Sequence, residues 1–414
     1  MSWPLDDGGV PIILGIDVDS LLRKKIEQAV GLLGEHEIDC WIAQLGQETW
    51  LHPDPIQPLV IGVSVTWPSA FLITAKGETI ALVGTGDQGN VRSNTAFERV
   101  EGYVRDLAPE LRRVLDELRP QRIGISTALS DYGADGLTHG WYERLLKMLE
   151  GTVYVERLCS AEPVVSKLRA RKLPEEIERI RRAVRATVEI FEAMGTWIRP
   201  GVSERDVFEF AHAQMARRKL EPSWDGAYDP GVNIGPKSEL GHGVPGAARA
   251  RPGDVVHVDF GVVLDGFGSD LQRVWYLRRP GESVAPEPVL EAFAAVDASI
   301  QAGAEALRPG RQGYEVDAVA RAVITGRGFP EPAFALGHMM GRVAHDGSGL
   351  LGPRWPRYGS TPEYRLESGN VFTLEFAVQP KDGSGGVIGL EEDVLVTAEG
   401  AEFLAPPQRE LWYV

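Results

Sequence analysis

The sequence predicts two domains: an α/β domain over residues 1–165, followed over residues 166–414 by an α+β domain in which helices cover a curved, largely antiparallel sheet. Three observations support this organisation. Helical and strand-like apolar patterns alternate as far as about residue 160, a charged stretch with a helix start follows, and strands with glycine-rich turns dominate beyond Pro222. A chain of 414 residues is long enough for two or three domains.

The first domain alternates short elements. Apolar residues at helical spacing predict helices, and short apolar runs predict strands. The predicted helices cover residues 21–33, 104–118 and 141–149, and the predicted strands cover 40–43, 71–74, 80–83 and 123–125. The turn residues Lys76 and Gly77 separate two of these strands and predict a hairpin. No motif in this part of the chain indicates chemistry.

The second domain begins with a helix start at Pro174. Proline suits the first helical turn because its missing N–H has no partner there, and Glu175 and Glu176 favour the positive end of the helix dipole. Ser203 and Asp206 predict the capped start of another helix. The later predicted elements are strands at 254–261, 268–277, 370–378 and 387–396 and a helix at 289–307.

Composition excludes several classes of function. The net charge of −16, with 59 acidic against 43 basic residues, argues against binding to a phosphate backbone. Cys40 and Cys159 lie far apart in sequence, so we expect neither a disulfide framework nor a thiolate zinc site. The chain starts without a basic stretch followed by an apolar core, and no run reaches 18 apolar residues. These features predict a cytoplasmic protein without a membrane span.

Carboxylates lie within apolar strands. Asp259 lies in the middle of the apolar run 255–261, where burying an unpaired charge is unfavourable. A four-residue loop from Val263 to Gly266 would place Asp259 directly opposite Asp270 on the returning strand. Two facing carboxylates destabilise a hairpin unless a cation lies between them. The alternative that stays open here is a surface hairpin with incidental acids.

Further candidate ligands follow downstream. Glu375 lies at the centre of the apolar run 370–378, and Glu391 lies at the start of another strand. The two acids after it are expected to be ordinary polar flanking residues: Glu392 and Asp393. His338 and His345 lie seven residues apart. On their own, a functional pair and a pair made of one core and one surface histidine are equally good interpretations. Together, the acids at strand centres and starts plus a histidine predict a metal site.

This order of residues resembles the creatinase/aminopeptidase clan, the "pita-bread" metallopeptidases of peptidase family M24. The matching motifs are VDFG…SDLQR, GHMMGRVAH, VFTLEF and GLEEDVLVT, which span residues 254–397. The clan includes methionine aminopeptidase, Xaa-Pro aminopeptidase and Xaa-Pro dipeptidase (prolidase). The first domain resembles the creatinase-type N-terminal domain in its pattern. This two-domain length favours the proline-specific members, since methionine aminopeptidase generally needs only the C-terminal domain.

The resemblance implies two divalent metal ions, with Asp270 and Glu391 bridging them. The implied ligands are Asp259, Asp270, His338, Glu375 and Glu391. A carboxylate-rich set with one imidazole favours Mn²⁺ or Co²⁺ and also allows Zn²⁺ or Fe²⁺. Two such ions can share a water molecule, lower its pKa and bind the carbonyl oxygen of the substrate.

Catalytic roles are also implied by the resemblance. His242, in the sequence Gly-His-Gly-Val-Pro, should contact the substrate or stabilise the tetrahedral intermediate, and His345 should hydrogen-bond near the scissile amide. Glu375 is expected to double as general base. The implied reaction is hydrolysis of the Xaa-Pro bond in short proline-containing peptides, by a homodimer.

Two positions depart from the pattern of the proline-specific members. Gln379 replaces a tyrosine, and Gly389 stands where those members tend to carry arginine. A replacement cation for a substrate carboxylate could come from one of several arginines: Arg342, Arg354, Arg357 or Arg365. Two alternatives therefore stay open: a metal-dependent non-peptide amidase or lyase of the same fold, and a peptide-binding pseudoenzyme.

Overall fold

The computed structural model describes residues 18–238, 241 and 243–414. The chain divides between Leu168 and Arg169 into two compact units, each with its own core. Within the described residues, none of the helices combines the length and the apolar character that crossing a bilayer requires.

The first unit contains a mixed six-stranded sheet with helices on both faces. Its strands are β1 (Cys40–Gly46), β2 (Ser69–Thr74), β3 (Thr79–Gly84), β4 (Arg99–Tyr103), β5 (Ile123–Ile125) and β6 (Leu158–Ser160). Its helices are α1 (Val18–Glu35), α2 (Gln88–Asn94), α3 (Leu107–Leu118), α4 (His139–Met148) and α5 (Glu162–Ala170), the last of which crosses the boundary. The strand order is β4-β3-β2-β1-β5-β6.

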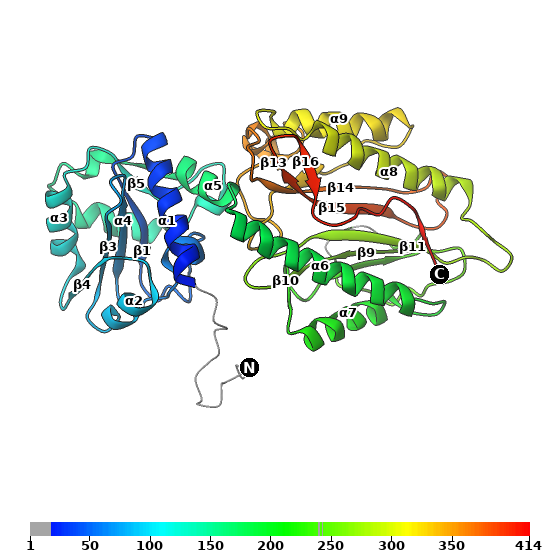
Figure 1. Ribbon diagram of the computed structural model, residues 1–414, viewed down its shortest axis with the longest axis horizontal. Coiled ribbons are helices and arrows are strands. Elements are labelled where there is room, and N and C mark those ends of the chain that lie inside the picture. The colour runs from blue at the N-terminus through cyan, green and yellow to red at the C-terminus, as the bar shows by residue number, and fades with distance from the viewer. Residues whose placement is uncertain (1–17, 239–240, 242) are drawn as a thin grey trace. The chain divides into compact units, whose positions relative to one another are not determined.

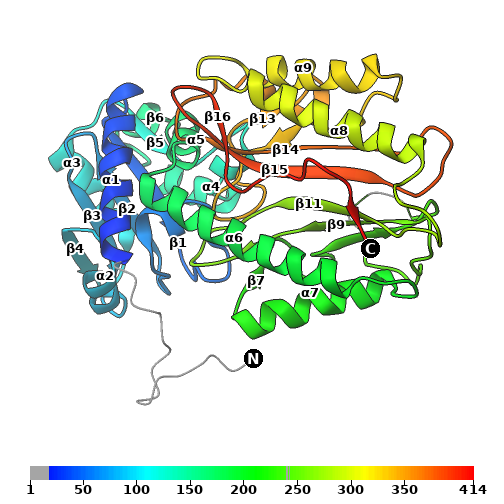
Figure 2. The ribbon, with the colours of Figure 1, turned by 45° about the vertical axis from the view of Figure 1, so that its right-hand side comes forward.

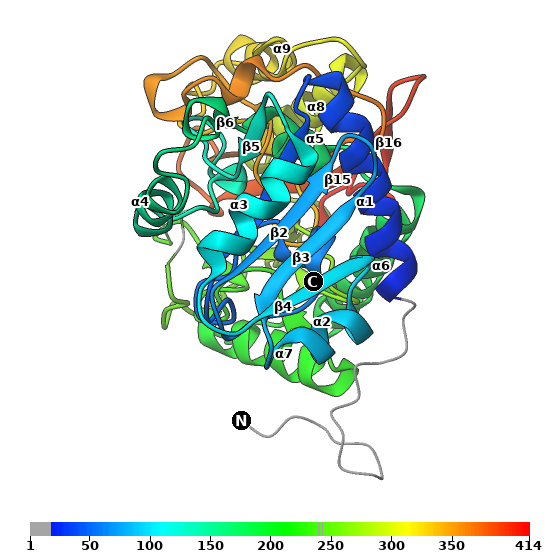
Figure 3. The same ribbon diagram turned by 90° about the vertical axis from the view of Figure 1, so that its left-hand side faces the viewer.

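Alternation along the strands explains the two helical layers. On β1, Trp41 and Ala43 belong to a core shared with α1 and α5, whereas Cys40 and Ile42 belong to a core shared with α3 and α4. Successive side chains of a strand point to opposite faces, so a buried strand with both faces covered is apolar throughout. Figure 3 shows α1 and α3 on opposite sides of the strands β2, β3 and β4.

The second unit contains a largely antiparallel sheet. Its principal strands are β8 (Gly231–Ile234), β9 (Val255–Phe260), β11 (Leu271–Tyr276), β14 (Val371–Val378), β15 (Ile388–Val396), β16 (Ala401–Phe403) and β17 (Trp412–Tyr413). The shorter strands are β7 (Glu221–Pro222), β10 (Val262–Val263), β12 (Gly337–His338) and β13 (Leu350–Leu351). Its helices are α6 (Pro174–Trp197), α7 (Glu204–Arg218), α8 (Glu287–Ala306) and α9 (Gly313–Gly326).

Helices α6 and α8 pack on different strands of this seven-stranded sheet. The central path is β14-β15-β11-β9-β8, with β16 beside β15 and β17 parallel to β11. Helix α8 packs on β14 and β15, and α6 packs on β10 and β11, as Figures 1 and 2 show. Phe191 of α6 packs edge-on against Phe260, with 5.8 Å between the ring centroids. This arrangement confirms the predicted α+β fold class.

The predicted helix starts are confirmed. Pro174 is the first residue of α6. Ser203 caps α7 reciprocally with Asp206: its hydroxyl accepts from the Asp206 backbone N–H at 3.1 Å, and the Asp206 carboxylate accepts from the Ser203 N–H at 2.8 Å. The pattern of apolar residues in the sequence did not predict α5 or β4. The β4 sequence, RVEGY, is too polar to stand out as a strand.

The turn between β9 and β11 differs from the prediction. Asp265 and Gly266 both have positive φ angles, 52° and 74°, and Leu264 pairs with Phe267. The connection is therefore a two-residue turn of the kind that Asp-Gly favours, and the predicted four-residue loop is wrong. The Asp-Gly dipeptide was the signal in the sequence that could have fixed the register.

Candidate active site

Four polar side chains lie in one row across the sheet. Glu375 on β14 pairs with Glu391 on β15, Glu391 pairs with Gln272 on β11, and Gln272 pairs with Asp259 on β9. Gly231 on β8 ends the row opposite Asp259. Directly opposed side chains on one face of a sheet lie close together, so strand register alone brings three of the predicted ligands side by side.

Asp270 lies one residue ahead of β11. Its predicted place directly opposite Asp259 is wrong, because the two-residue turn puts Gln272 there. The shift is by two residues, and a side-chain period of two returns Asp270 to the same face as a diagonal neighbour of Asp259. The backbone N–H of Asp270 donates to the Asp393 carboxylate at 3.0 Å, which fixes the start of the strand.

His338 on β12 points its Nε2 atom at the carboxylates. That nitrogen lies 3.7 Å from an oxygen of Asp270, 3.8 Å from one of Glu391 and 3.9 Å from one of Glu375. The other ring nitrogen, Nδ1, lies 3.1 Å from the backbone carbonyl of Ala344. A carbonyl accepts only from N–H, so the proton belongs on Nδ1 and the Nε2 lone pair faces the acids, the orientation of a metal-binding histidine.

The electrostatics of the cluster call for a cation. Burial raises the pKa of Asp259 to about 7 and that of Glu375 to about 8. Burial and then the neighbouring carboxylates raise the pKa values of Asp270 and Glu391 well above their usual range. Acids that are this difficult to ionise are stabilised as carboxylates when positive charge lies among them.

Unpaired oxygens show where that charge fits. No described residue donates a hydrogen bond to the buried atoms Asp259 Oδ1, Asp270 Oδ1 and Glu391 Oε1. Ligand atoms of Asp270, His338 and Glu391 all lie within 4.8 Å of one another. Buried polar atoms normally have partners. This cluster of oxygens with one imidazole therefore fits a divalent cation that accepts oxygen and nitrogen ligands.

The cluster forms the polar part of a cavity of about 670 Å³. Aromatic and aliphatic side chains line the rest of the cavity: Trp224, Tyr228, Phe334, Leu350 and Tyr358. His345 also lines it, with its ring 4.0 Å from the His338 ring between centroids. An apolar cavity of this size with a few convergent polar groups is typical of a site for a small ligand.

The lining that the structure describes includes no lysine or arginine, so none of the four candidate arginines lines the cavity. Arg357 contacts a lining residue, because its guanidinium donates to the hydroxyl of Tyr358 at 2.8 Å. Arg354 instead stacks over Tyr314, 3.6 Å from the ring centroid. His242 lies outside the described residues, so its predicted role stays a prediction.

Glu392 and Asp393 were predicted to be ordinary polar flanking residues. Both are buried, so this prediction is wrong. The Glu392 carboxylate accepts from the Arg273 guanidinium at 2.9 Å, and Asp393 accepts from Asp270 as described above. All nine residues of β15 are buried because the strand lies inside the sheet with both faces covered. The apolar residues that follow Asp393 were the signal that the strand is central.

Gln272 was not predicted as a site residue. Its amide donates to Glu391 at 2.9 Å and to Glu375 at 3.1 Å. His257, which shares the strand face of Asp259, lies 2.9 Å from the Gln272 carbonyl oxygen and 2.9 Å from Asn233. Burial lowers the pKa of His257 to about 4, so its ring is neutral near pH 7.

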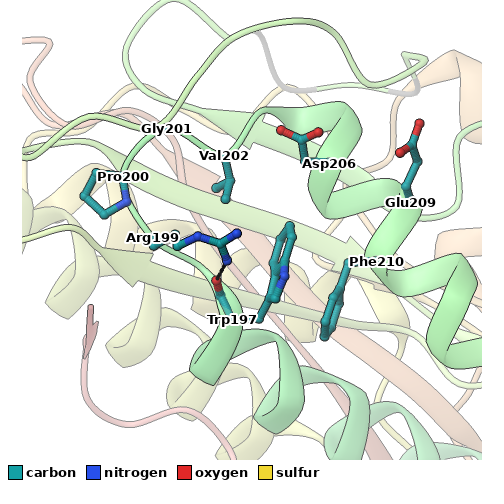
Figure 4. A pocket seen from close by; sticks show the side chains of 8 residues that line it. All are labelled: Trp197, Arg199, Pro200, Gly201, Val202, Asp206, Glu209 and Phe210. Atoms are coloured by element: carbon teal, nitrogen blue, oxygen red, sulfur yellow. Dashed lines mark hydrogen bonds between the residues drawn. The ribbon is translucent and has the colours of Figure 1, made fainter.

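A second pocket, of about 620 Å³, lies where α6 leads into α7. There Trp197 and Phe210 stack with 4.6 Å between ring centroids, and the Arg199 guanidinium donates to the Trp197 carbonyl (Figure 4). The Asp206 carboxylate is engaged in the α7 cap. Among the residues that the structure describes, this pocket has no cluster of ligand atoms like that beside His338.

Comparison with known proteins identifies the family of this chain. The model of metallopeptidase family M24 matches residues 178–398, just over half of the chain. The chain belongs to this family. An Xaa-Pro dipeptidase from Pyrococcus furiosus is 31% identical over 261 residues, which cover 62% of this chain and 69% of that protein. An Xaa-Pro dipeptidase from Pyrococcus horikoshii is 28% identical over 66% of this chain and 72% of its own length.

Solved structures of this metallopeptidase fold extend the similarity over nearly the whole chain. An Xaa-Pro dipeptidase from Bacillus anthracis superposes with a TM-score of 0.73 at 23% identity, covering 95% of this chain and 100% of that one. An X-Pro aminopeptidase from Thermotoga maritima gives 0.70 at 22% identity, covering 94% and 99%. The resemblance to the pita-bread metallopeptidases is therefore confirmed for the fold.

Proposed function

We propose that this M24 metallopeptidase hydrolyses the Xaa-Pro bond of short peptides. The observation that carries the proposal is the row of carboxylates beside His338 at one side of an apolar cavity of about 670 Å³. Relatives named Xaa-Pro dipeptidase share this family and cover more than 60% of the chain. The aromatic walls suit a flat, apolar proline ring.

We propose the following metal ligands: Asp259, Asp270, His338, Glu375 and Glu391. From the family resemblance, Asp270 and Glu391 would be the ligands shared by two ions. Each places an oxygen within 4 Å of His338 Nε2, and each has a buried oxygen, Oδ1 of Asp270 and Oε1 of Glu391, without a hydrogen bond from the described residues. When bound, two divalent cations, with Mn²⁺ or Co²⁺ favoured, would supply Lewis-acid activation of water and carbonyl.

The protein side chains would bind the peptide and move the proton. Glu375 would take the proton from the attacking water, because a carboxylate that is ionised beside bound metal can accept it. His345, exposed at the cavity beside His338, would donate to the peptide near the scissile amide. We further propose, from the family resemblance, that His242 contacts the substrate and that the protein is a homodimer.

Hydrolysis of defined peptides tests this function. Protein stripped by chelator and refilled with Mn²⁺, Co²⁺ or Zn²⁺ would be given Xaa-Pro dipeptides, Xaa-Pro-Yaa tripeptides and proline-free controls. We expect metal-dependent cleavage before proline, with substrate length separating a dipeptidase from an aminopeptidase. Metal binding without cleavage of any peptide would favour a non-peptide amidase or lyase, and absence of metal binding would favour a pseudoenzyme.

A further inference from the structure

We propose that Gln272, backed by His257, is the positioning residue of the metal site, and that Gly389 is glycine to leave room for this pair. The proposal rests on the metal ligands proposed above but not on the identity of the substrate. One neutral amide would then orient two ligand carboxylates, and it would do so from the space into which, by the family resemblance, an arginine side chain at position 389 would project.

Both amide hydrogens of Gln272 are used on ligands. They point to Oε2 of Glu391 at 2.9 Å and to Oε2 of Glu375 at 3.1 Å. The opposite oxygen of each carboxylate, Oε1, faces His338 at 3.8 and 3.9 Å. Gln272 therefore fixes the far oxygen of each glutamate and leaves the near oxygen directed at the centre of the cluster, where a metal ion would bind.

The orientation of the Gln272 amide follows from its surroundings. With metal ions bound, both glutamates would be ionised and would carry no hydrogen to donate, so a flipped amide would direct its oxygen at two acceptors. The amide nitrogen therefore faces the glutamates, and the amide oxygen faces His257 Nε2 at 2.9 Å. His257 is fully buried and neutral, so its single N–H belongs on Nε2, where it donates to Gln272, and its Nδ1 atom lies 2.9 Å from the side-chain amide of Asn233. These contacts hold the Gln272 side chain in a single position.

Gly389 has no room for a side chain. A Cβ atom built there would lie 2.6 Å from Gln272 Oε1 and 2.6 Å from His257 Nε2. Gly389 precedes Glu391 by two residues on β15, so a side chain at 389 would project from the same face as the ligand. The volume that an arginine would need is filled by the glutamine and the histidine, and the three positions act as one unit.

No other described cation takes over the role of that arginine. Arg273, the nearest in sequence, is buried and pairs with Glu392 at 2.9 Å, and it also donates to the Glu391 backbone carbonyl at 3.0 Å. It therefore contacts the backbone of the ligand and not its carboxylate. The neutral Gln272 leaves the negative charge of the ligands uncompensated, and bound metal ions would supply the compensation.

Metal affinity measured without substrate tests this proposal. Gln272→Met keeps the volume but removes both hydrogen bonds, and we expect the Kd for Mn²⁺ to rise by about 10- to 100-fold. Gly389→Ala keeps every polar group but pushes the glutamine aside, and we expect a weaker loss in the same direction. Titration calorimetry gives both constants. The control is Gln44→Met, which removes a buried glutamine donor of the first unit and should leave the affinity unchanged.

A rescue experiment tests whether the pair replaces an arginine. Gly389→Arg alone should abolish tight Mn²⁺ binding, because the space is filled. In a His257→Ala/Gln272→Ala background, adding Gly389→Arg should restore affinity above that of the background. Circular dichroism would establish that each variant is folded. If Gln272→Met fails to fold, Gly389→Ala decides.

Wild-type affinity in a folded Gln272→Met or Gly389→Ala protein would overturn the proposal, as would tight binding by the single Gly389→Arg variant. These outcomes are separate from those of the peptide assay. A wild-type protein that binds metal but cleaves no peptide would refute the Xaa-Pro proposal and leave the role of Gln272 intact.

Discussion

Removing the metal should make the stability of the protein depend on pH in a defined direction. Without metal, the folded-state pKa of Asp259 is raised from 3.8 to about 7 by burial. A carboxyl group whose pKa is raised by folding binds more protons in the folded than in the unfolded state. Its contribution to stability is therefore complete below about pH 4 and is lost as the pH rises through about 7. With metal bound, the carboxylate is ionised and neutralised, so the loss does not occur.

The size of the effect follows from the shift. At about 1.4 kcal/mol per pKa unit, a rise from 3.8 to about 7 corresponds to about 4 kcal/mol for Asp259 as an upper limit. For a unit of this size, 1 kcal/mol changes Tm by about 2–4 °C, so the limit corresponds to about 10 °C. We therefore expect the Tm of the metal-loaded protein minus that of the metal-free protein to grow by several degrees between pH 5 and pH 8.

Scanning calorimetry with chelator or with excess Mn²⁺, at each pH, measures this difference and resolves the two units where they unfold separately. The control is the metal-free Asp259→Asn protein, which has no proton to lose at this position and whose Tm should fall less than that of the metal-free wild type as the pH rises. A difference that stays constant or shrinks as the pH rises would show that the buried carboxylates are not the origin of metal-linked stability.

Three further outcomes are expected. Asp270→Asn should lower the metal content measured by elemental analysis and abolish hydrolysis; full metal content would remove it from the ligand set. His345→Ala should lower kcat by about 10²- to 10⁴-fold at unchanged metal content, and an unchanged kcat would exclude a catalytic role. Asp346→Ala should lower the free energy of unfolding in urea by about 3–5 kcal/mol, because Arg169 at 2.6 Å and Lys172 at 3.0 Å lose their buried partner. A change below about 1 kcal/mol would contradict that reading.

Much of the fold could be predicted from local patterns. The strands carrying Asp259 and Glu375 were predicted because long apolar runs interrupted by one carboxylate are unusual. The strand of Glu391 was predicted from the apolar residues on either side of its three acids, and the helix starts at Pro174 and Ser203 follow from capping chemistry. Such features depend only on neighbouring residues, which explains their success.

The predictions that failed concerned residues whose partners lie far away in the sequence. Gln272 is an ordinary polar residue until the strand register places it between Asp259 and Glu391, and the register depended on a two-residue turn taken for a longer loop. Glu392 and Asp393 were taken for polar flanking residues because their partners, Arg273 and the Asp270 backbone, are more than 100 residues away in sequence. The residues next to Glu392 and Asp393 in the sequence do not indicate such partners.

The row from Glu375 to Asp259 has a consequence for folding. Its members belong to four strands that are separated along the chain by loops and helices, and each strand must pair in a single register for the row to form. A slip of one residue would turn a carboxylate to the opposite face of the sheet. Metal uptake during refolding would therefore report correct strand assembly, and metal ions would favour the native register over its misaligned competitors.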